Sequence, residues 1–340
     1  MQIGLNFVTP LWTGGASRQA NRVQTTGLLG SLRWWYEALV RGLGGYACDP
    51  TGDHRCLAEK GLCSACQVFG ATGQAKAFRL SLEQTRMASQ RPYGLTDDVV
   101  RSRRAGRDGQ PARYYFPEGL LGQAGFSVLP RLPNDTATPN LLLSLLEFIR
   151  RYAALGAKTN LGYGLFEWIT SPAELEQAPK LSQQVESRAT ARAGNNPLWP
   201  DLRRMFFATV QLPKPWSAVG FVDFKNDLRM AVRTSPVIQG DVPDPRDQDR
   251  LRHFLLGTVR ENPNQASKIK MALLPGMQTL RVWGWVPEQL PGRLSRDVIL
   301  DLLHGQIGAL GKVEWREYAS TRDTVGQFNA PVLYLDSLMQ

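Results

Sequence analysis

One order of predicted strands and helices occurs twice along the chain, and this repeat constrains the fold more than any other feature. In the first half a strand at residues 3–7 precedes a helix that begins near residue 26, and a strand at 78–82 precedes a helix over 140–155. Alternating apolar residues predict the strands, and apolar residues three or four apart predict the helices. Further extended segments before the second helix and a last strand at 165–169 complete the order βαββαβ.

The same order restarts after a segment that is rich in Gln, Pro, Ala and Ser and shows little periodicity. The predicted elements of the second half are a strand at 205–212, a helix at 244–258, strands at 269–274 and 280–285, a helix that begins after Ser295, and a strand at 313–318. Two such units predict an α+β protein with two tandem ferredoxin-like domains, the topology that RRM-type RNA-binding modules share.

We therefore divide the 340 residues into three parts. Residues 1–170 form a predicted N-terminal domain, 171–200 a linker and 201–340 a C-terminal domain, which agrees with a chain about twice the usual domain length. The N-terminal domain carries two insertions, a Cys-rich segment at 46–70 and a basic loop at 86–113.

The charge of the chain favours a polyanionic partner. Lys and Arg number 40 and Asp and Glu number 30, a net charge of +10, which is typical of proteins that bind nucleic acid. The longest nearly apolar stretch, residues 141–149, is far shorter than the roughly 20 residues that span a membrane. The first residues lack the basic start and long apolar region of a secretory signal. We expect a cytoplasmic protein that does not contact membranes.

The Cys-rich segment contains every cysteine of the chain: Cys48, Cys56, Cys63 and Cys66. Four thiolates suit tetrahedral zinc, and the Cys-x-x-Cys spacing at its end is that of a zinc knuckle. We therefore predict a structural zinc site that leaves no open position for catalysis. Three alternatives stay open, namely His54 in place of one thiolate, reduced cysteines that only pack together, and a redox pair of Cys63 and Cys66.

Four short motifs in the first half carry a family resemblance. Residues 9–15 read Thr-Pro-Leu-Trp-Thr-Gly-Gly, and residues 27–36 read Gly-Leu-Leu-Gly-Ser-Leu-Arg-Trp-Trp-Tyr. Residues 68–73 read Val-Phe-Gly-Ala-Thr-Gly, and 162–164 form a Gly-Tyr-Gly turn. This combination resembles the RAMP superfamily of CRISPR effector subunits, most closely the Cmr-type subunit one family of type III-B complexes. The second half is similar only in its predicted topology, and the cysteines lie outside the resemblance.

The resemblance implies a function and a set of partners. It implies a non-catalytic RNA-binding subunit of a type III-B CRISPR ribonucleoprotein in antiviral defence. Such a subunit would bind the 3′ region of the crRNA, the single-stranded target RNA, or both, and would assemble with other RAMP subunits.

The Gly-Tyr-Gly turn is the first predicted RNA contact. The resemblance implies that this loop approaches the RNA backbone, which Gly162 and Gly164 would permit, with Tyr163 between them and Lys158 and Asn160 just before. A tight turn that needs positive φ angles explains part of the same pattern.

A row of charged residues on the first helix is the second candidate. Arg33, Glu37 and Arg41 are spaced four apart, opposite the leucine face. A solvated face with an ion pair is one interpretation. The other adds Arg33 to a basic surface that contacts RNA phosphates, with Trp34 nearby for packing or stacking.

The basic loop at 86–113 is the third candidate, because it holds seven arginines and three acids. We predict a mobile loop or hairpin that becomes ordered on RNA. Its predicted RNA-binding residues are Arg101, Arg103, Arg104 and Arg107. A solvated surface loop is the alternative.

Catalysis has little support in the sequence, so we do not expect an enzyme. The histidines at 54, 253 and 304 are scattered, and they form no recognisable triad or metal motif. The alternative is a guide-processing endoribonuclease of the RAMP superfamily that uses His304 or a loop aspartate, Asp97 or Asp98. A purely architectural subunit whose basic surface contacts protein neighbours is a third possibility.

Overall fold

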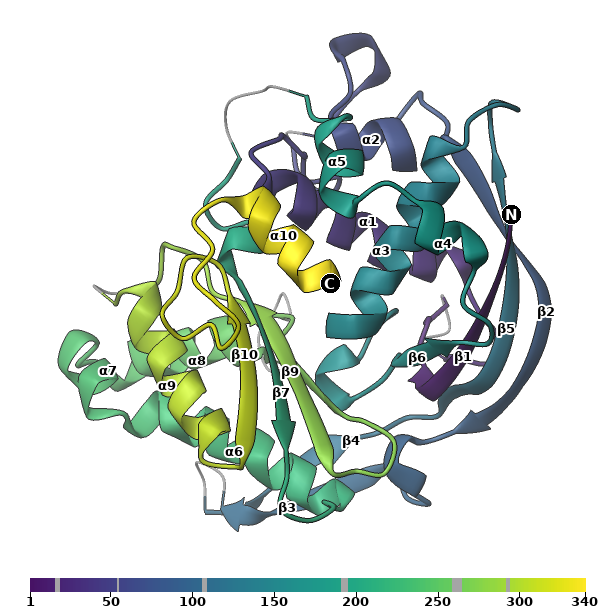
Figure 1. Cartoon of the computed structure of the whole chain (residues 1–340). Helices are drawn as coiled ribbons and strands as arrows, with labels where there is room; N and C mark the ends of the chain where they lie inside the picture. The colour runs from purple at the N-terminus through teal and green to yellow at the C-terminus, as the bar shows by residue number, and fades with distance from the viewer. Residues whose placement is uncertain (16–18, 54, 106–108, 191–194, 259–264, 292–293) are drawn as a thin grey trace.

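The computed structural model describes residues 1–340 except 16–18, 54, 106–108, 191–194, 259–264 and 292–293. Within the described residues the chain forms two four-stranded antiparallel sheets and one two-stranded hairpin. The two large sheets lie in separate halves of the molecule, with helices between them and on the far side of the second sheet (Figure 1). No described helix is both long and apolar enough to cross a membrane.

The first sheet has the strand order β2-β5-β1-β6. Its strands are β1 (Gln2–Leu11), β2 (Phe78–Gln90), β5 (Gly119–Pro130) and β6 (Phe166–Trp168). Helices α1 (Thr25–Gly42) and α3 (Ala137–Tyr152) cover one face (Figure 1). Alternation in β1 sends Ile3, Leu5 and Phe7 into the core beneath these helices, as the sequence predicts.

The second sheet has the strand order β10-β7-β9-β8. Its strands are β7 (Met205–Gln211), β8 (Ile269–Leu273), β9 (Thr279–Trp285) and β10 (Lys312–Glu317), and its helices are α6 (Ala218–Thr234), α7 (Pro236–Asp241), α8 (Pro245–Leu256) and α9 (Arg296–Gly308). In both sheets the last strand pairs with the first, the first with the third and the third with the second. The predicted element order βαββαβ is therefore present in each half.

The sequence located one helix of the second half and missed the helix before it. The helix predicted at 244–258 is present as α8, whereas α6, which follows β7 directly, was not predicted. Asp223, Lys225 and Asn226 are buried in α6, so charged and polar residues interrupt the apolar pattern that would reveal this helix.

One of the two hydrophobic cores contains residues of both halves. Phe207 of β7 packs against Trp35 of α1 and against Phe148 and Tyr152 of α3, with ring centroids 6.4, 5.7 and 5.1 Å apart. Trp34 packs edge-on against Trp35 at 4.8 Å. Helices of the first half thus cover the open face of the second sheet.

The segment between the halves is folded, and the C-terminal helix returns to the first half. The described part of 171–200 contains α4 (Ala173–Gln177) and α5 (Leu181–Glu186). Helix α10 (Pro331–Met339) lies beside α5 (Figure 1). Arg151 Nη1 and Tyr152 Oη of α3 donate to carbonyl oxygens of α10 at 2.9 and 2.8 Å. This helix therefore contacts the half from which it is most distant in sequence.

Several short elements complete the fold. The hairpin consists of β3 (Val99–Ala105) and β4 (Pro111–Tyr115), and the short helices are η1 (Ala58–Lys60), α2 (Ser64–Phe69), η2 (Pro92–Gly94), η3 (Thr159–Leu161) and η4 (Leu202–Arg204).

Candidate metal site and nucleic-acid interface

The four cysteines converge on one buried point. The sulfur atoms of Cys48, Cys56, Cys63 and Cys66 all lie within 4.8 Å of one another. Cys48 Sγ is 3.5 Å from Cys66 Sγ and 3.7 Å from Cys63 Sγ, far beyond the roughly 2.05 Å of a disulfide. Sulfurs around tetrahedral zinc, with bonds of about 2.3 Å, would be roughly 3.8 Å apart. The donor set therefore fits a tetrahedral metal ion.

Local structure explains the convergence. Cys63 is the residue before α2 and Cys66 lies in its first turn, while Cys48 follows α1. The backbone N–H of Cys63 donates to Cys56 Sγ at 3.3 Å. Contacts with Cys48 and Cys66 lower the pKa of Cys63, while the pKa values of Cys48 and Cys66 are raised, because one thiolate disfavours ionisation of its neighbours. His54, the alternative ligand, lies outside the described residues.

Arg33 lies at this cysteine cluster. Its side chain is only 15% exposed and donates to Glu37 Oε1 at 2.7 Å, to the Gly70 carbonyl at 2.8 Å and to Cys66 Sγ at 3.2 Å. Glu37 and Arg41 are buried as well. The expectation of a solvated helix face is therefore wrong, because the Cys-rich insertion covers this face of α1.

Packing accounts for the glycines of the Gly-Tyr-Gly turn. Gly162 and Gly164 have φ angles of +87° and +83°, a region that side chains other than glycine rarely adopt. A Cβ on Gly162 would collide with Tyr93 Oη, and one on Gly164 with a backbone carbonyl. Tyr163 is fully buried. The tight-turn interpretation thus explains these three residues.

The residues before the turn lie at the junction of the two halves. Lys158 Nζ is 4.8 Å from the centroid of the Trp12 ring, and burial lowers the pKa of Lys158. The carbonyl of Asn160 accepts a 2.9 Å hydrogen bond from Lys225 of α6. Both Lys158 and Asn160 keep partly exposed side chains, and their contact with RNA stays a prediction.

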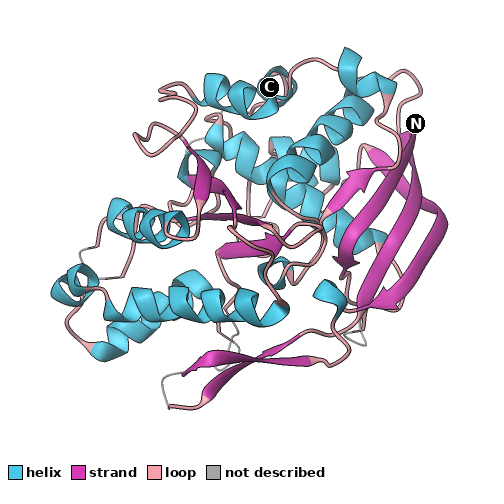
Figure 2. Cartoon of the chain, turned by 60° about the horizontal axis from the view of Figure 1, so that its bottom comes forward, coloured by secondary structure: helices cyan, strands magenta, loops and turns pink. Residues whose placement is uncertain are grey.

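The predicted mobile loop at 86–113 contains a folded hairpin. Residues 86–90 belong to β2, and β3, which pairs with β4, lies along α6 (Figure 2). Asp223 of α6 accepts hydrogen bonds from Ser102 Oγ at 2.8 Å and from the backbone and Nε of Arg103 at 2.7 Å each. Val100 and Tyr114 join the core of the second half. The expected loop or hairpin is therefore present as a hairpin with buried contacts to the second half, and its ordering on RNA stays a prediction.

The outer face of this hairpin is basic and carries an aromatic ring. Arg101 pairs directly with Arg113, and the neighbouring pair is Val99 with Tyr115. Tyr115 is 60% exposed. Among the described residues neither arginine of the pair has an acidic partner. Like charges placed opposite each other slightly destabilise a hairpin, and this pair is free to contact an anion.

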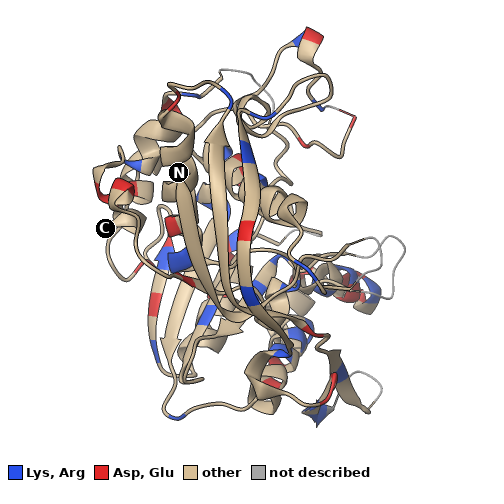
Figure 3. Cartoon of the chain, turned by 90° about the vertical axis from the view of Figure 1, so that its right-hand side faces the viewer, with Lys and Arg blue, Asp and Glu red and all other residues tan. Residues whose placement is uncertain are grey.

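The other arginines of the hairpin are also exposed, and Figure 3 shows basic positions along it. Arg103 and Arg104 pair with Asp223 and Asp227 of α6 and still have side chains that are 75% and 62% exposed. Arg107 lies outside the described residues. Sequence reasoning missed Arg113 and Tyr115, although alternation within β4 places both on the face opposite buried Tyr114.

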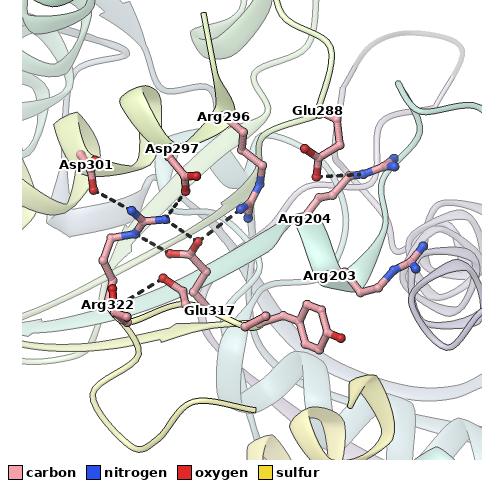
Figure 4. A pocket seen from close by; sticks show the side chains of 12 residues that line it. Arg203, Arg204, Glu288, Arg296, Asp297, Asp301, Glu317 and Arg322 are labelled. Atoms are coloured by element: carbon pink, nitrogen blue, oxygen red, sulfur yellow. Dashed lines mark hydrogen bonds and ion pairs between the residues drawn. The ribbon is translucent and has the colours of Figure 1, made fainter. Parts of the chain in front are cut away.

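A cavity of about 710 Å³ lies beside α9 and the end of β10 (Figure 4). Arg322 donates to Asp301 at 2.6 Å, to Asp297 at 2.7 Å and to Glu317 at 2.8 Å. Arg296 also pairs with Glu317, at 3.3 Å. Four arginines and four acids line the cavity, so its charges balance one another within the fold.

The residues considered for catalysis have ordinary places in the structure. His304 of α9 packs edge-on against Trp315 with ring centroids 5.1 Å apart. Asp97 and Asp98 are exposed in the segment before β3.

Comparison with protein families identifies the class of the first half. Residues 5–167 match the model of the RAMP superfamily. The match spans the motifs at 9–15, 27–36, 68–73 and 162–164, so the predicted resemblance is confirmed for this part of the chain.

Among solved structures, the chain is similar to Cmr1 from Pyrococcus furiosus in its apo form, with a TM-score of 0.47, 14% identity, and coverage of 92% of this chain and 97% of that chain. It is also similar to a chain of the type III-B Cmr-beta complex bound to cognate target RNA, with a TM-score of 0.46, 10% identity, and coverage of 90% and 99%. Comparison with curated proteins gives no match.

Proposed function

We propose that the chain is a non-catalytic RNA-binding subunit of a type III-B CRISPR ribonucleoprotein, and that both halves are ferredoxin-like domains. The RAMP match over 5–167, the common strand order of the two sheets and the net charge of +10 support this proposal. The ligand is crRNA, single-stranded target RNA or both, and the protein partners are other RAMP subunits.

The outer face of the β3–β4 hairpin carries the proposal. Arg101 and Arg113 stand opposite each other without acidic partners among the described residues, next to exposed Tyr115. Guanidinium groups neutralise phosphates and stack on bases, and an exposed aromatic ring stacks on an unpaired base. RNA bound there would relieve the repulsion between the two arginines.

We propose zinc as the metal of the cysteine cluster. Four cysteines complete a tetrahedral set and leave no position for a water molecule, so the ion would hold the insertion together rather than take part in chemistry. Bound zinc would keep the thiolates charged and fix the two ends of the 46–70 segment near α1.

The RNA proposal can be tested with the purified full chain and a fluorescent single-stranded RNA of about 20 nucleotides. Removing two phosphate contacts in a double variant, Arg101→Ala with Arg113→Ala, should reduce the slope of log affinity against log salt by about 1.4. Tyr115→Ala should cost about 1–3 kcal/mol of binding free energy. Arg250→Ala, at an exposed arginine of α8 that pairs with Asp247, is the control.

Two results would contradict the proposal. An unchanged slope and affinity in the hairpin variants would exclude this face as the RNA interface. Defined cleavage of CRISPR repeat RNA by the wild-type chain, abolished in His304→Ala or Asp98→Ala, would instead support the endoribonuclease alternative.

A further inference from the structure

A ladder of three charged side chains connects helix α1 to the cysteine cluster. Arg33, Glu37 and Arg41 lie on successive turns and face the Cys-rich insertion. Burying charges is unfavourable unless each one finds partners with good geometry. The hydrogen-bond partners of these three residues therefore indicate the role of the ladder.

Each nitrogen of the Arg33 guanidinium has its own acceptor. Nε donates within α1 to Glu37, Nη1 donates to the carbonyl of Gly70 at the end of α2, and Nη2 donates to Cys66 Sγ at 3.2 Å. A neutral thiol is a weak acceptor, whereas hydrogen bonds to an ionised acceptor are about twice as strong. Metal binding at Cys66 would turn this third contact into a charge-assisted hydrogen bond.

Arg41 contacts the backbone at the start of the insertion. Its Nε and Nη2 donate to the carbonyls of Ala47 and Cys48, each at 3.0 Å. Glu37 lies between the two arginines, 2.7 Å from Arg33 and 3.5 Å from Arg41. The ladder thus contacts one cysteine through its sulfur and another through its backbone.

The charges of the ladder complement those of a metal site. A divalent ion with four thiolates carries a net charge of −2, because each thiolate contributes −1. The two arginines and Glu37 together carry +1. A metal–thiolate group of charge −2 beside this row of charge +1 brings the buried site closer to neutrality.

We propose that Arg33 is a positioning residue of the metal site, and that its hydrogen bond to the Cys66 thiolate fastens the metal-bound insertion to α1. The inference rests on the metal site proposed above and is independent of RNA binding. In this role Arg33 raises the affinity for the metal, because an outer hydrogen bond orients the ligand and stabilises its charge. Arg33 then serves the insertion rather than RNA phosphates.

The test measures metal affinity of the full chain by competition with a chromophoric chelator, using Zn²⁺ and then Co²⁺. Arg33→Met should lower the affinity about 10–100-fold, the usual effect of losing an outer-shell partner, and should shift the cobalt–thiolate absorption band. Arg33→Lys keeps the charge and should recover part of the affinity. Arg150→Met, which removes a partly buried arginine paired with Glu147 on α3, should change neither quantity.

Each failure has its own signature. Wild-type metal affinity and an unshifted cobalt band in Arg33→Met would overturn the inference about Arg33. The proposed metal site would still be supported if a variant with Cys63→Ser and Cys66→Ser lost the metal. A wild-type chain that binds no Zn²⁺ would overturn both. If circular dichroism shows that Arg33→Met is unfolded, Arg33→Lys becomes the deciding variant. Wild-type metal affinity and a wild-type cobalt spectrum in Arg33→Lys would show that the guanidinium group is not required.

Discussion

The buried carboxylate of Asp223 is the central polar contact between the hairpin and α6, and we expect Asp223→Ala to loosen the hairpin. Asp223 accepts three hydrogen bonds, from Ser102 Oγ and from two nitrogens of Arg103. The Arg103 side chain is largely exposed, so water replaces its bond and little is lost. The buried Ser102 hydroxyl and the Arg103 amide each lose a charged acceptor at about 1–3 kcal/mol. We expect a total of about 3 kcal/mol, or on the order of a 100-fold rise in the undocked population.

Hydrogen exchange measured by mass spectrometry tests this expectation. Peptides from β3 and β4 should exchange faster in Asp223→Ala, while peptides from β7 and β9 should not change. Asp227→Ala is the matched control, because Asp227 pairs with exposed Arg104 at 3.3 Å and should matter by less than about 1 kcal/mol. Hairpin protection equal to that of the wild type would refute the reasoning.

Acid provides an independent check of the same contact. Although burial opposes ionisation, hydrogen bonds from Arg103 and Ser102 hold the pKa of Asp223 below its usual value. A lowered pKa in the folded state means that the stabilisation is fully present above about pH 4 and is lost as the pH falls through the folded-state pKa. Wild-type hairpin protection, corrected for intrinsic rates, should therefore decrease in acid, and the Asp223→Ala variant should lack this decrease.

Two further predictions concern the core and its pH dependence. Phe207→Ala should lower the free energy of unfolding by about 3–5 kcal/mol. Fluorescence and circular dichroism should both report a single denaturant transition, whereas two separate transitions would contradict a core shared by the two halves. Although burial opposes ionisation of Glu147, hydrogen bonds from Arg150 and Arg151 lower its pKa to about 2, so about 3 kcal/mol of stability should be present above about pH 4.5 and disappear toward pH 2. An acid titration of unfolding free energy should lose this component in Glu147→Gln, and an unchanged titration would exclude the assignment.

The sequence predicted features that depend on near neighbours. Alternation of apolar residues located β1, and the Cys-x-x-Cys spacing of Cys63 and Cys66 predicted that the two thiols lie close together, as they do at the start of α2. Helix α6 escaped prediction because Asp223 and Lys225 meet partners, Arg103 and Asn160, that are far away in sequence. Such distant partners allow a charged residue to be buried, and the local hydrophobic pattern does not reveal them.

The same limit explains the site residues. Arg33, Glu37 and Arg41 would have the same spacing on a solvated face, on an RNA surface or beneath an insertion, and only the fold shows that the insertion covers them. The family resemblance found the correct superfamily for 5–167. It could not find Tyr115, because no motif covers the hairpin and only strand pairing shows which side chains point outward.

The return of α10 to the first half has a consequence for biosynthesis. Leu335 and Leu338 of α10 and Phe207 of β7 belong to the same core as Trp35 and Phe148. Because the ribosome synthesises the chain from the N-terminus onward, Trp35 and Phe148 leave the ribosome long before the segments that cover them. Until residues 331–339 have been made, nascent chains expose apolar surface that can associate with other molecules. The time between the synthesis of α1 and that of α10 therefore sets how long this apolar surface stays exposed.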